Sequence, residues 1–346
     1  MKHLVILAAA CLAACTTPSQ SQPANTLVGS EGATEVVSAS ITRAPTLHGD
    51  KPIVIAHRGA SGLYPEHTAA AYKAAIEQGA DFIEPDLVVT SDGVLIVRHD
   101  NFLSATTNVA DHPEFADRKK VKATPLGEKE DWWVEDFTLA DIKTLKARQQ
   151  FEGRETKYDD QYDILTFDEV MDIALEAAKA GHIVGLHVEA KWPGDFAAQG
   201  FDMPDLMIAA MDKKGLKAAG IPVYIQCFEP PFLAEFASKS DLPTIQNMVG
   251  PPYAAMLGLD YKLEDIHTTG VGAEKSMILN ADGTTSDFVD RAHKLGLLVH
   301  VYTVRDDHPG EGFADSRAEF RALFDAGVDG VWTDYPATGL AVRDAE

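Results

Sequence analysis

The chain has 346 residues, of which 45% are hydrophobic and 24% are charged, which suits a globular protein and excludes a disordered or fibrous one. Its 30 Lys and Arg residues against 53 Asp and Glu residues give a net charge of −23 at pH 7. Nucleic acids and anionic lipid surfaces are both bound through basic surface, so we expect no nucleic-acid partner and no polybasic membrane contact. An anionic ligand would need a locally positive pocket.

Residues 1–14 are typical of a secretory signal, because a short basic start precedes an apolar run that is too short to span a bilayer. The run Leu12-Ala13-Ala14-Cys15 resembles a bacterial lipobox, which predicts cleavage before Cys15 and lipidation of that residue. A simple signal peptide cleaved nearby is the alternative. We expect a protein of the bacterial cell envelope, periplasm-facing or in the outer membrane, whose membrane contact is the lipid anchor.

Residues 15–46 are rich in Ser, Thr, Ala and Pro and poor in large apolar side chains, which predicts a flexible tether. The folded domain is then expected over residues 47–346. Cys227 would be the only thiol left in that domain, so no disulfide is predicted. Its apolar neighbours favour a buried core residue over a catalytic thiol.

Between residues 51 and 340, short β-rich runs alternate with helical patterns. Eight such runs predict a TIM (β/α)8 barrel of the α/β class, and no glycine-rich nucleotide motif follows any of them. The expected strands are Ile53–Ala56, Phe82–Leu87, Val94–His99, Val184–Glu189, Val223–Phe228, Thr244–Val249, Leu297–Thr303 and Gly330–Thr333. The expected helices include Thr68–Gln78, Phe167–Ala180, Asp287–Leu295 and one that begins after an N-cap at Thr138.

The segment of about residues 101–163 is too long for a simple connection between two elements. Its charged residues and its aromatic residues Trp132, Trp133 and Phe137 predict a small inserted subdomain. Long excursions of this kind often lie over the active site of a barrel.

Two of the expected strands end in histidine. His57 is followed by Arg58, and His99 is followed by Asp100, which could orient the imidazole. Active sites of barrels assemble at the carboxyl ends of the strands, and a pair of imidazoles suits general acid–base chemistry on a phosphoester. His57 and His99 are therefore the candidate acid–base pair, with the roles of acid and base left open. The alternative is that each histidine is a structural group at a strand end.

Three carboxylates occupy alternating strand positions. Alternate residues of a strand point to the same side, so Glu84 and Asp86 project together, as do Glu189 and Lys191. Carboxylates that share a dry interior repel one another unless something neutralises them. A divalent cation would do so, and hard oxygen ligands suit Ca²⁺ or Mg²⁺ rather than zinc. The alternative is a set of salt bridges to neighbouring Arg and Lys side chains.

Around these residues the sequence resembles the glycerophosphodiester phosphodiesterase family over about residues 51–340. The matching blocks are His57-Arg58-Gly59-Ala60-Ser61-Gly62 with Pro65-Glu66-His67-Thr68, Gly79–Leu87 with Asp92-Gly93-Val94 and His99-Asp100, Glu189-Ala190-Lys191, Val299–Arg305 and Gly327–Pro336. Gln226-Cys227-Phe228, the ending Tyr302-Thr303-Val304-Arg305 and the long insertion look like the bacterial periplasmic, calcium-dependent branch. Pro85 is a mild departure from the family pattern.

The resemblance implies a TIM barrel with an insertion that hydrolyses small-molecule glycerophosphodiesters, such as glycerophosphocholine or glycerophosphoethanolamine, to sn-glycerol 3-phosphate and an alcohol. It implies one divalent cation, Ca²⁺ ahead of Mg²⁺. The implied roles are metal binding by Glu84, Asp86 and Glu189, acid–base catalysis by His57 and His99, and phosphate binding by Arg58 and Lys191. Gln226, Tyr302 and Trp332 are candidates for the pocket wall, with barrel packing as the alternative.

Two other functions stay open at this stage. One is a barrel phosphodiesterase that acts on intact phospholipid, and the other is a non-catalytic surface lipoprotein that binds a ligand. The nucleophile is open as well: water attacks directly, or the neighbouring glycerol hydroxyl attacks first and forms a cyclic phosphate that water then opens. No oligomeric state is predicted.

Overall fold

The computed structural model describes residues 43–124 and 127–345. The expected signal segment, the lipidation at Cys15 and residues 15–42 of the expected tether lie outside the described residues. The last residues of that tether, 43–46, lie against the folded domain. The Ala44 N–H donates to the Asp325 carbonyl at 3.0 Å, and Arg43 Nε donates to the Phe324 carbonyl at 3.1 Å.

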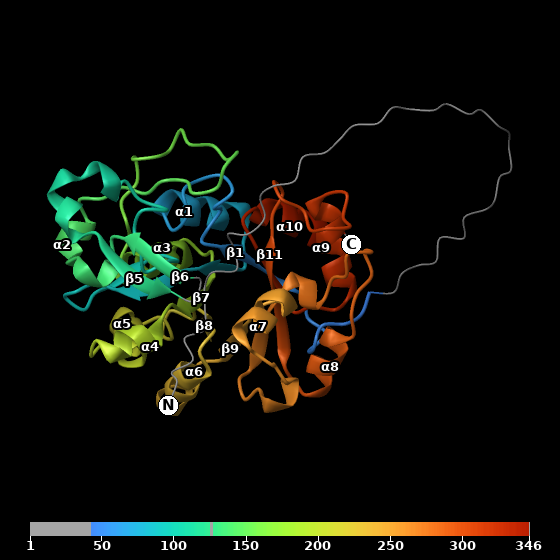
Figure 1. Ribbon diagram of the computed structural model, residues 1–346. Coiled ribbons are helices and arrows are strands. Elements are labelled where there is room, and N and C mark those ends of the chain that lie inside the picture. The colour runs from blue at the N-terminus through green and yellow to red at the C-terminus, as the bar shows by residue number, and fades with distance from the viewer. Residues whose placement is uncertain (1–42, 125–126, 346) are drawn as a thin grey trace, which may run out of the picture.

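Eight parallel strands close into a barrel (Figure 1), which confirms the TIM barrel expected from the sequence. In order around the barrel, the strands are β1 Ile53–His57, β2 Phe82–Glu84 with its continuation β3 Asp86–Val89, β7 Gly185–Ala190, β8 Val223–Cys227, β9 Thr244–Met248, β10 Gly270–Glu274, β11 Leu298–Val304 and β12 Gly330–Thr333. The pairing of β2 with β7 and of β12 with β1 closes the ring.

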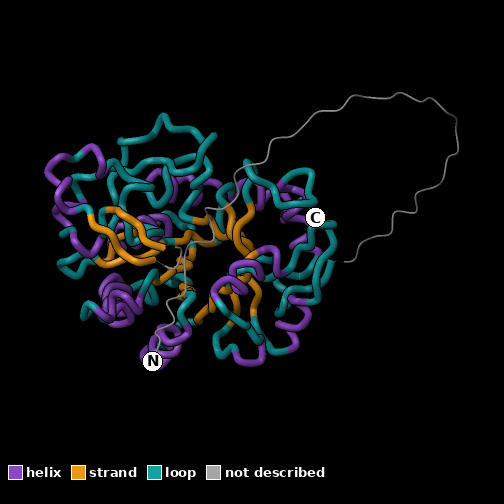
Figure 2. Tube along the Cα trace, viewed as in Figure 1, coloured by secondary structure: helices purple, strands orange, loops and turns teal. Residues whose placement is uncertain are grey.

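Helices surround the strands (Figure 2). They are α1 Ala69–Gln78, α3 Phe167–Lys179, α4 Pro193–Ala198, α5 Met203–Lys214, α6 Pro230–Lys239, α7 Pro251–Leu257, α8 Phe288–Lys294, α9 Ser316–Asp325 and α10 Pro336–Arg343. The expected helices over 68–78, 167–180 and 287–295 correspond to α1, α3 and α8 to within one residue at each end. Within the described part of the chain, no helix is both long enough and apolar enough to cross a membrane.

One of the eight expected strands is not a strand of the barrel. Residues 94–99 do not form a barrel strand, because β4 Leu95–Val97 pairs antiparallel with β3 as an outer hairpin strand. The barrel strand that was missed is β10, whose glycines hide the β-rich pattern. The barrel needs these glycines, since a Cβ on Gly272 would lie 2.2 Å from Asn247 Oδ1.

The expected strand over 82–87 is divided in two at Pro85, which has no N–H to donate to the ladder. Before the break, β2 pairs with both β1 and β7, and after it β3 pairs with β7 and β4. The alternation of side chains continues across the break. His57 is opposite Glu84, and Asp86 is opposite Glu189, so the carboxyl ends of three neighbouring strands present ionisable side chains together.

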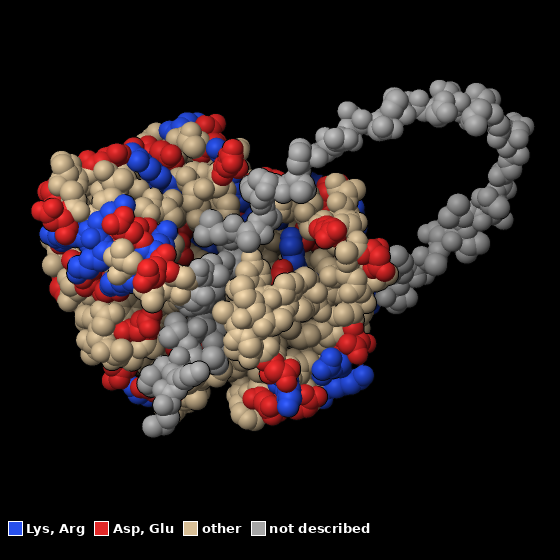
Figure 3. All heavy atoms as spheres, viewed as in Figure 1, with Lys and Arg blue, Asp and Glu red and all other residues tan. Residues whose placement is uncertain are grey.

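The expected insertion contains the hairpin of β5 Lys120–Thr124 and β6 Gly127–Asp131 and the short helix α2 Leu139–Ile142. It lies to one side of the barrel, at left in Figure 1. Thr138 caps α2 in a reciprocal pair of hydrogen bonds with Asp141. Basic and acidic side chains are intermixed over this side of the surface, whereas the surface over α7 is mostly uncharged (Figure 3).

Glycine makes room for aromatic rings inside the barrel, and Gly185 is a sharp case: a Cβ there would lie 2.2 Å from Cε1 of Phe82. We expect Gly185→Ala to lower the free energy of unfolding by about 1–3 kcal/mol, because the added methyl group overpacks this contact. Urea unfolding followed by circular dichroism measures the loss. Adding Phe82→Leu relieves the contact, so the double variant should lose less stability than the sum of the single variants. An unchanged unfolding midpoint for Gly185→Ala would contradict the packing argument.

Candidate active site

A cavity opens at the carboxyl end of the barrel. Nine of the residues predicted from the sequence line it: His57, Arg58, Glu84, His99, Glu189, Lys191, Gln226, Tyr302 and Trp332. Asp86 is fully buried and lies beside them, whereas Cys15 is outside the described residues. The structure therefore brings together all of the predicted site residues that it describes.

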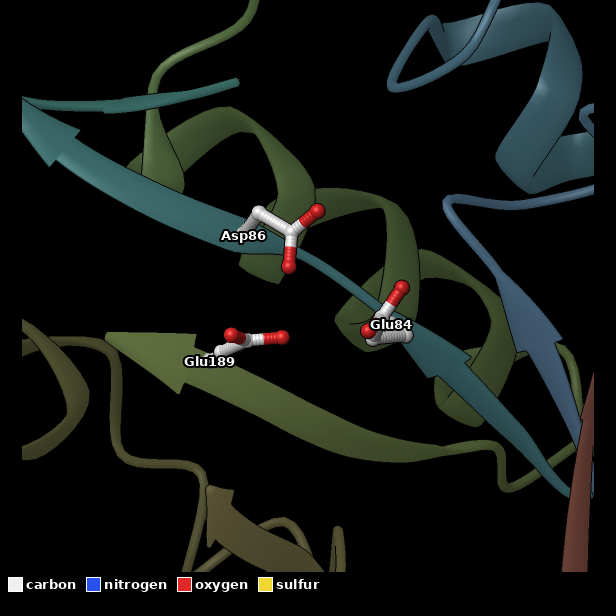
Figure 4. A group of neighbouring side chains, drawn as sticks. All are labelled: Glu84, Asp86 and Glu189. Atoms are coloured by element: carbon white, nitrogen blue, oxygen red, sulfur yellow. The ribbon is translucent and has the colours of Figure 1, made fainter. Parts of the chain in front are cut away.

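The three predicted metal ligands turn their carboxylates toward one another (Figure 4). Glu84, Asp86 and Glu189 each offer one oxygen, and these oxygens lie within 4.8 Å of one another. Asp86 Oδ1 is buried and has no hydrogen-bond donor among the described residues. An orphaned buried oxygen beside two further carboxylates is a donor set that a divalent cation would satisfy. The triad fits such an ion.

The shared burial drives the pKa values of the triad apart. Burial raises the pKa of Glu84 well above its usual value, and the charges of Asp86 and Glu189 raise it further. Burial also raises the pKa of Glu189, and the value reaches about 8 although Lys191 opposes the shift. For Asp86, Lys191 and the hydrogen bond from His67 outweigh burial and hold the pKa well below its usual value.

Two cations are interleaved with the carboxylates. Arg58, in a left-handed conformation with φ 58°, donates its backbone N–H to Glu84 Oε2 at 2.9 Å, and its Nε lies 3.5 Å from Asp86 Oδ2. Lys191 Nζ lies 2.6 Å from Glu189 Oε1 and 3.6 Å from Asp86 Oδ1. The salt bridges considered as the alternative to a metal site are thus present beside the triad. Both cations also line the cavity, where they can offset an anionic group.

His57 is held by a carboxylate that the sequence analysis missed. Its Nδ1 lies 2.6 Å from Asp334 Oδ1, and Asp334 Oδ2 accepts hydrogen bonds from Arg154 at 2.6 Å and Arg305 at 2.8 Å. Burial and then Arg58 lower the pKa of His57 to about 4, although Asp334 opposes the shift. Burial favours the neutral acid of Asp334, but Arg305 and His57 hold its pKa well below the usual value. Neutral His57 therefore donates its Nδ1 proton to Asp334, which leaves the Nε2 lone pair as an acceptor.

His99 has a similar arrangement. Its Nδ1 lies 2.9 Å from Asp100 Oδ1, as the sequence suggested. Burial, followed by the charges of Arg58 and Lys191, lowers the pKa of His99 well below its usual value. Burial raises the pKa of Asp100 to about 6. Two neutral imidazoles, each oriented by a carboxylate, therefore line one cavity.

Other residues form hydrogen bonds to the side chains of the site, and these residues were not predicted from the sequence either. Glu66 Oε2 accepts hydrogen bonds from Arg58 at 2.6 Å and from Gln150 at 2.5 Å. His67 Nε2 lies 2.9 Å from Asp86 Oδ2. Glu66 and His67 belong to the first matched block but not to a strand end, and Gln150 and Arg154 come from the insertion. Asp334 follows β12 directly, so its strand-end position is the one signal that could have identified it.

The sequence matches the glycerophosphoryl diester phosphodiesterase family over residues 57–338. The chain belongs to this family. It is 36% identical over 319 residues to a glycerophosphodiester phosphodiesterase of Arabidopsis thaliana, covering 84% of this chain and 85% of the relative. Identity to a glycerophosphodiester phosphodiesterase of Bacillus subtilis is 35% over 296 residues, covering 83% and 85%. These matches confirm the family and the enzyme class, a phosphoric diester hydrolase, that the sequence resemblance implied.

Solved structures agree on the fold. A phosphodiesterase of Oleispira antarctica in complex with the product sn-glycerol-3-phosphate aligns with a TM-score of 0.57 at 22% identity, covering 86% of this chain and 99% of that one. A glycerophosphodiester phosphodiesterase of Agrobacterium tumefaciens aligns with a TM-score of 0.53 at 20% identity, covering 84% and 99%. The barrel architecture is therefore shared at low sequence identity.

Metal binding to the triad should release protons. Because the pKa of Glu189 is about 8, this carboxyl is protonated at lower pH, and a cation must displace the proton. We expect the affinity for Ca²⁺ or Mg²⁺ to rise between about pH 6 and about pH 9. Titration calorimetry in buffers of different ionisation enthalpy measures the affinity for the cation and the number of protons that are released. Glu189→Gln should weaken binding and flatten the pH dependence, whereas Glu114→Gln on the surface should change neither. Binding that is independent of pH in the wild type would argue against the triad.

Proposed function

We propose that this chain uses one divalent cation to hydrolyse glycerophosphodiesters to sn-glycerol 3-phosphate and an alcohol, with His57 and His99 as the acid–base pair. The observation that carries the proposal is the convergence of two carboxylate-oriented imidazoles, a carboxylate triad and two cations on one cavity. Membership of the family supports the reaction class. The product in the complex of the Oleispira phosphodiesterase supports the same product in this chain.

The phosphate of the substrate would lie between the triad and the two cations. When bound by Glu84, Asp86 and Glu189, the divalent cation supplies Lewis-acid polarisation of a non-bridging phosphate oxygen. Arg58 and Lys191 orient the phosphate and offset the negative charge that builds on it during the reaction. The three hard oxygen donors suit Ca²⁺ or Mg²⁺, and the resemblance of the sequence to the calcium-dependent branch of the family favours Ca²⁺.

His57 and His99 carry out the proton transfers in this proposal. One imidazole, in its neutral form, takes the proton of the attacking oxygen, from water or from the neighbouring glycerol hydroxyl. The other must first take up a proton on its Nε2 from solvent, and it then gives this proton to the departing alkoxide. Asp334 would stabilise the imidazolium that forms if His57 accepts the proton, and Asp100 would do the same for His99. The low pKa of each free imidazole keeps the base unprotonated at neutral pH, and the negative charge of a bound phosphodiester favours the protonated form of the acid.

We expect His57→Ala and His99→Ala each to lower kcat by about 10²–10⁴-fold, because each substitution removes one proton-transfer group. Release of sn-glycerol 3-phosphate from glycerophosphocholine, followed by phosphorus NMR, measures the effect and would also reveal a cyclic phosphate intermediate. Prior chelation should abolish turnover, and added Ca²⁺ should restore it.

The controls for this experiment separate chemistry from folding and substrate class. His112→Ala changes a histidine of the insertion outside the cavity and should keep wild-type turnover. Near-normal turnover by either cavity variant would remove that histidine from the acid–base role. Intact phosphatidylcholine tested in parallel distinguishes the proposed substrate from a membrane phospholipid.

We further propose that the chain is a lipoprotein of the bacterial envelope, anchored through Cys15. The support is the run Leu12-Ala13-Ala14-Cys15 after a short apolar segment. Mass spectrometry of the mature N-terminus should find a diacylated or triacylated Cys15, and Cys15→Ala should abolish the modification. An unmodified N-terminus in the wild type would favour a simple signal peptide instead.

A further inference from the structure

Two further cavities continue outward from the active site along the loops that follow β7 and β8. The first is narrow and shares Glu189, Lys191 and Phe228 with the active-site cavity. The second is wider, about 390 Å³, lies among α4, α5 and α6 and shares Pro193 and Glu229 with the first. The three cavities thus form a row that begins at the phosphate-binding lysine.

Glu229 is the unusual group in this row. It is 9% exposed, lines both outer cavities, and accepts the N–H of Gly194 at 3.1 Å. None of the ion pairs among residues 43–124 and 127–345 includes it. Burial raises its pKa to about 7. Burial has removed most of the hydration of this carboxylate, and no positive side chain compensates for the loss. A cation bound at this part of the cavity wall would therefore stabilise the charged form.

The other carboxylates of the wide cavity differ from Glu229. Asp202 and Glu235 also line it, but both pair with Lys239, at 2.9 Å and 2.8 Å. No Lys or Arg is among the described residues that line this cavity. The row therefore presents a cation, Lys191, at its inner end and an uncompensated carboxylate farther out.

Aromatic rings complete the surroundings of Glu229. Phe228 and Trp192 line the narrow cavity with it, and Phe201 and Phe232 line the wide one. The faces of aromatic rings attract alkylammonium groups, and this attraction grows when the cation is shielded from water. A carboxylate among aromatic rings is a recognition site for an organic ammonium ion.

We propose that this row of cavities, the leaving-group groove, binds the departing alcohol of the diester and selects alcohols that carry an ammonium group. The inference rests on the proposed function, because it assigns the phosphate to the Lys191 end of the groove. It names Glu229 as the specificity-determining residue. The preferred substrates are then zwitterionic glycerophosphodiesters with an alkylammonium headgroup.

The test compares two diesters, glycerophosphocholine and the neutral-headgroup glycerophosphoethanol, by the ratio of their kcat/KM values. We expect the wild type to prefer the choline ester and Glu229→Gln to reduce the ratio by about tenfold, since the amide keeps the shape and loses the charge. Phe201→Leu should reduce the same ratio by a smaller factor. Glu114→Gln, which removes an exposed carboxylate of the insertion that lines none of the three cavities, should leave the ratio unchanged. Equal losses on both esters in Glu229→Gln, or no preference in the wild type, would overturn the proposal.

A binding measurement separates the groove from the reaction. Calorimetric titration of the full chain with tetramethylammonium should detect binding that Glu229→Gln weakens about tenfold and Glu114→Gln does not. If the wild type hydrolyses neither ester but binds tetramethylammonium through Glu229, the proposed function fails and the cation site stands. If both esters are hydrolysed without preference and no binding is detected, the proposed function stands and the groove assignment fails. Circular dichroism of each variant establishes that it is folded.

Discussion

The burial of three carboxylates within 4.8 Å of one another is the constraint on which the site depends. Charges of one sign in a dry interior repel strongly, and each has lost its hydration. The surrounding residues offset this repulsion with positive charges and hydrogen bonds. Lys191 and Arg58 lie against the carboxylates, His67 bonds to Asp86, and the backbone N–H of Arg58 bonds to Glu84. A divalent cation would complete the neutralisation, so the arrangement of these carboxylates suits the binding of such an ion.

The insertion takes part in this arrangement. Gln150 bonds to Glu66, the carboxylate that holds the guanidinium of Arg58, and Arg154 bonds to Asp334, the carboxylate that holds His57. Neither contact reaches the cavity directly. Each one orients a group that does, so the insertion supports the side chains that we propose to bind phosphate and transfer protons.

The barrel and the cavity residues could be predicted from the sequence because both follow from local pattern. Side chains alternate between the two faces of a strand, so spacing alone predicts that Glu84 and Asp86 point to the same side, as do Glu189 and Lys191. The residues that hold His57 and Glu66 could not be paired with them in this way. Asp334 lies at a strand end, but its contact with His57 and the contact of Gln150 with Glu66 join distant parts of the chain, and local spacing does not encode such contacts. Strand β10 escaped for another reason: close packing against Asn247 and Leu298 selects glycine, which erases the β-rich composition.

The hydrogen bond between His57 and Asp334 joins the first barrel strand to the residue after the last one, 277 positions away. During synthesis from the N-terminus, most of the catalytic side chains emerge long before this carboxylate does. A chain that stops before β12 leaves His57 without the group that sets its tautomer, and it also leaves the ring of strands open. Strand β12 and the residue after it therefore serve two purposes at once, because they close the ring of strands and they place the carboxylate that orients His57.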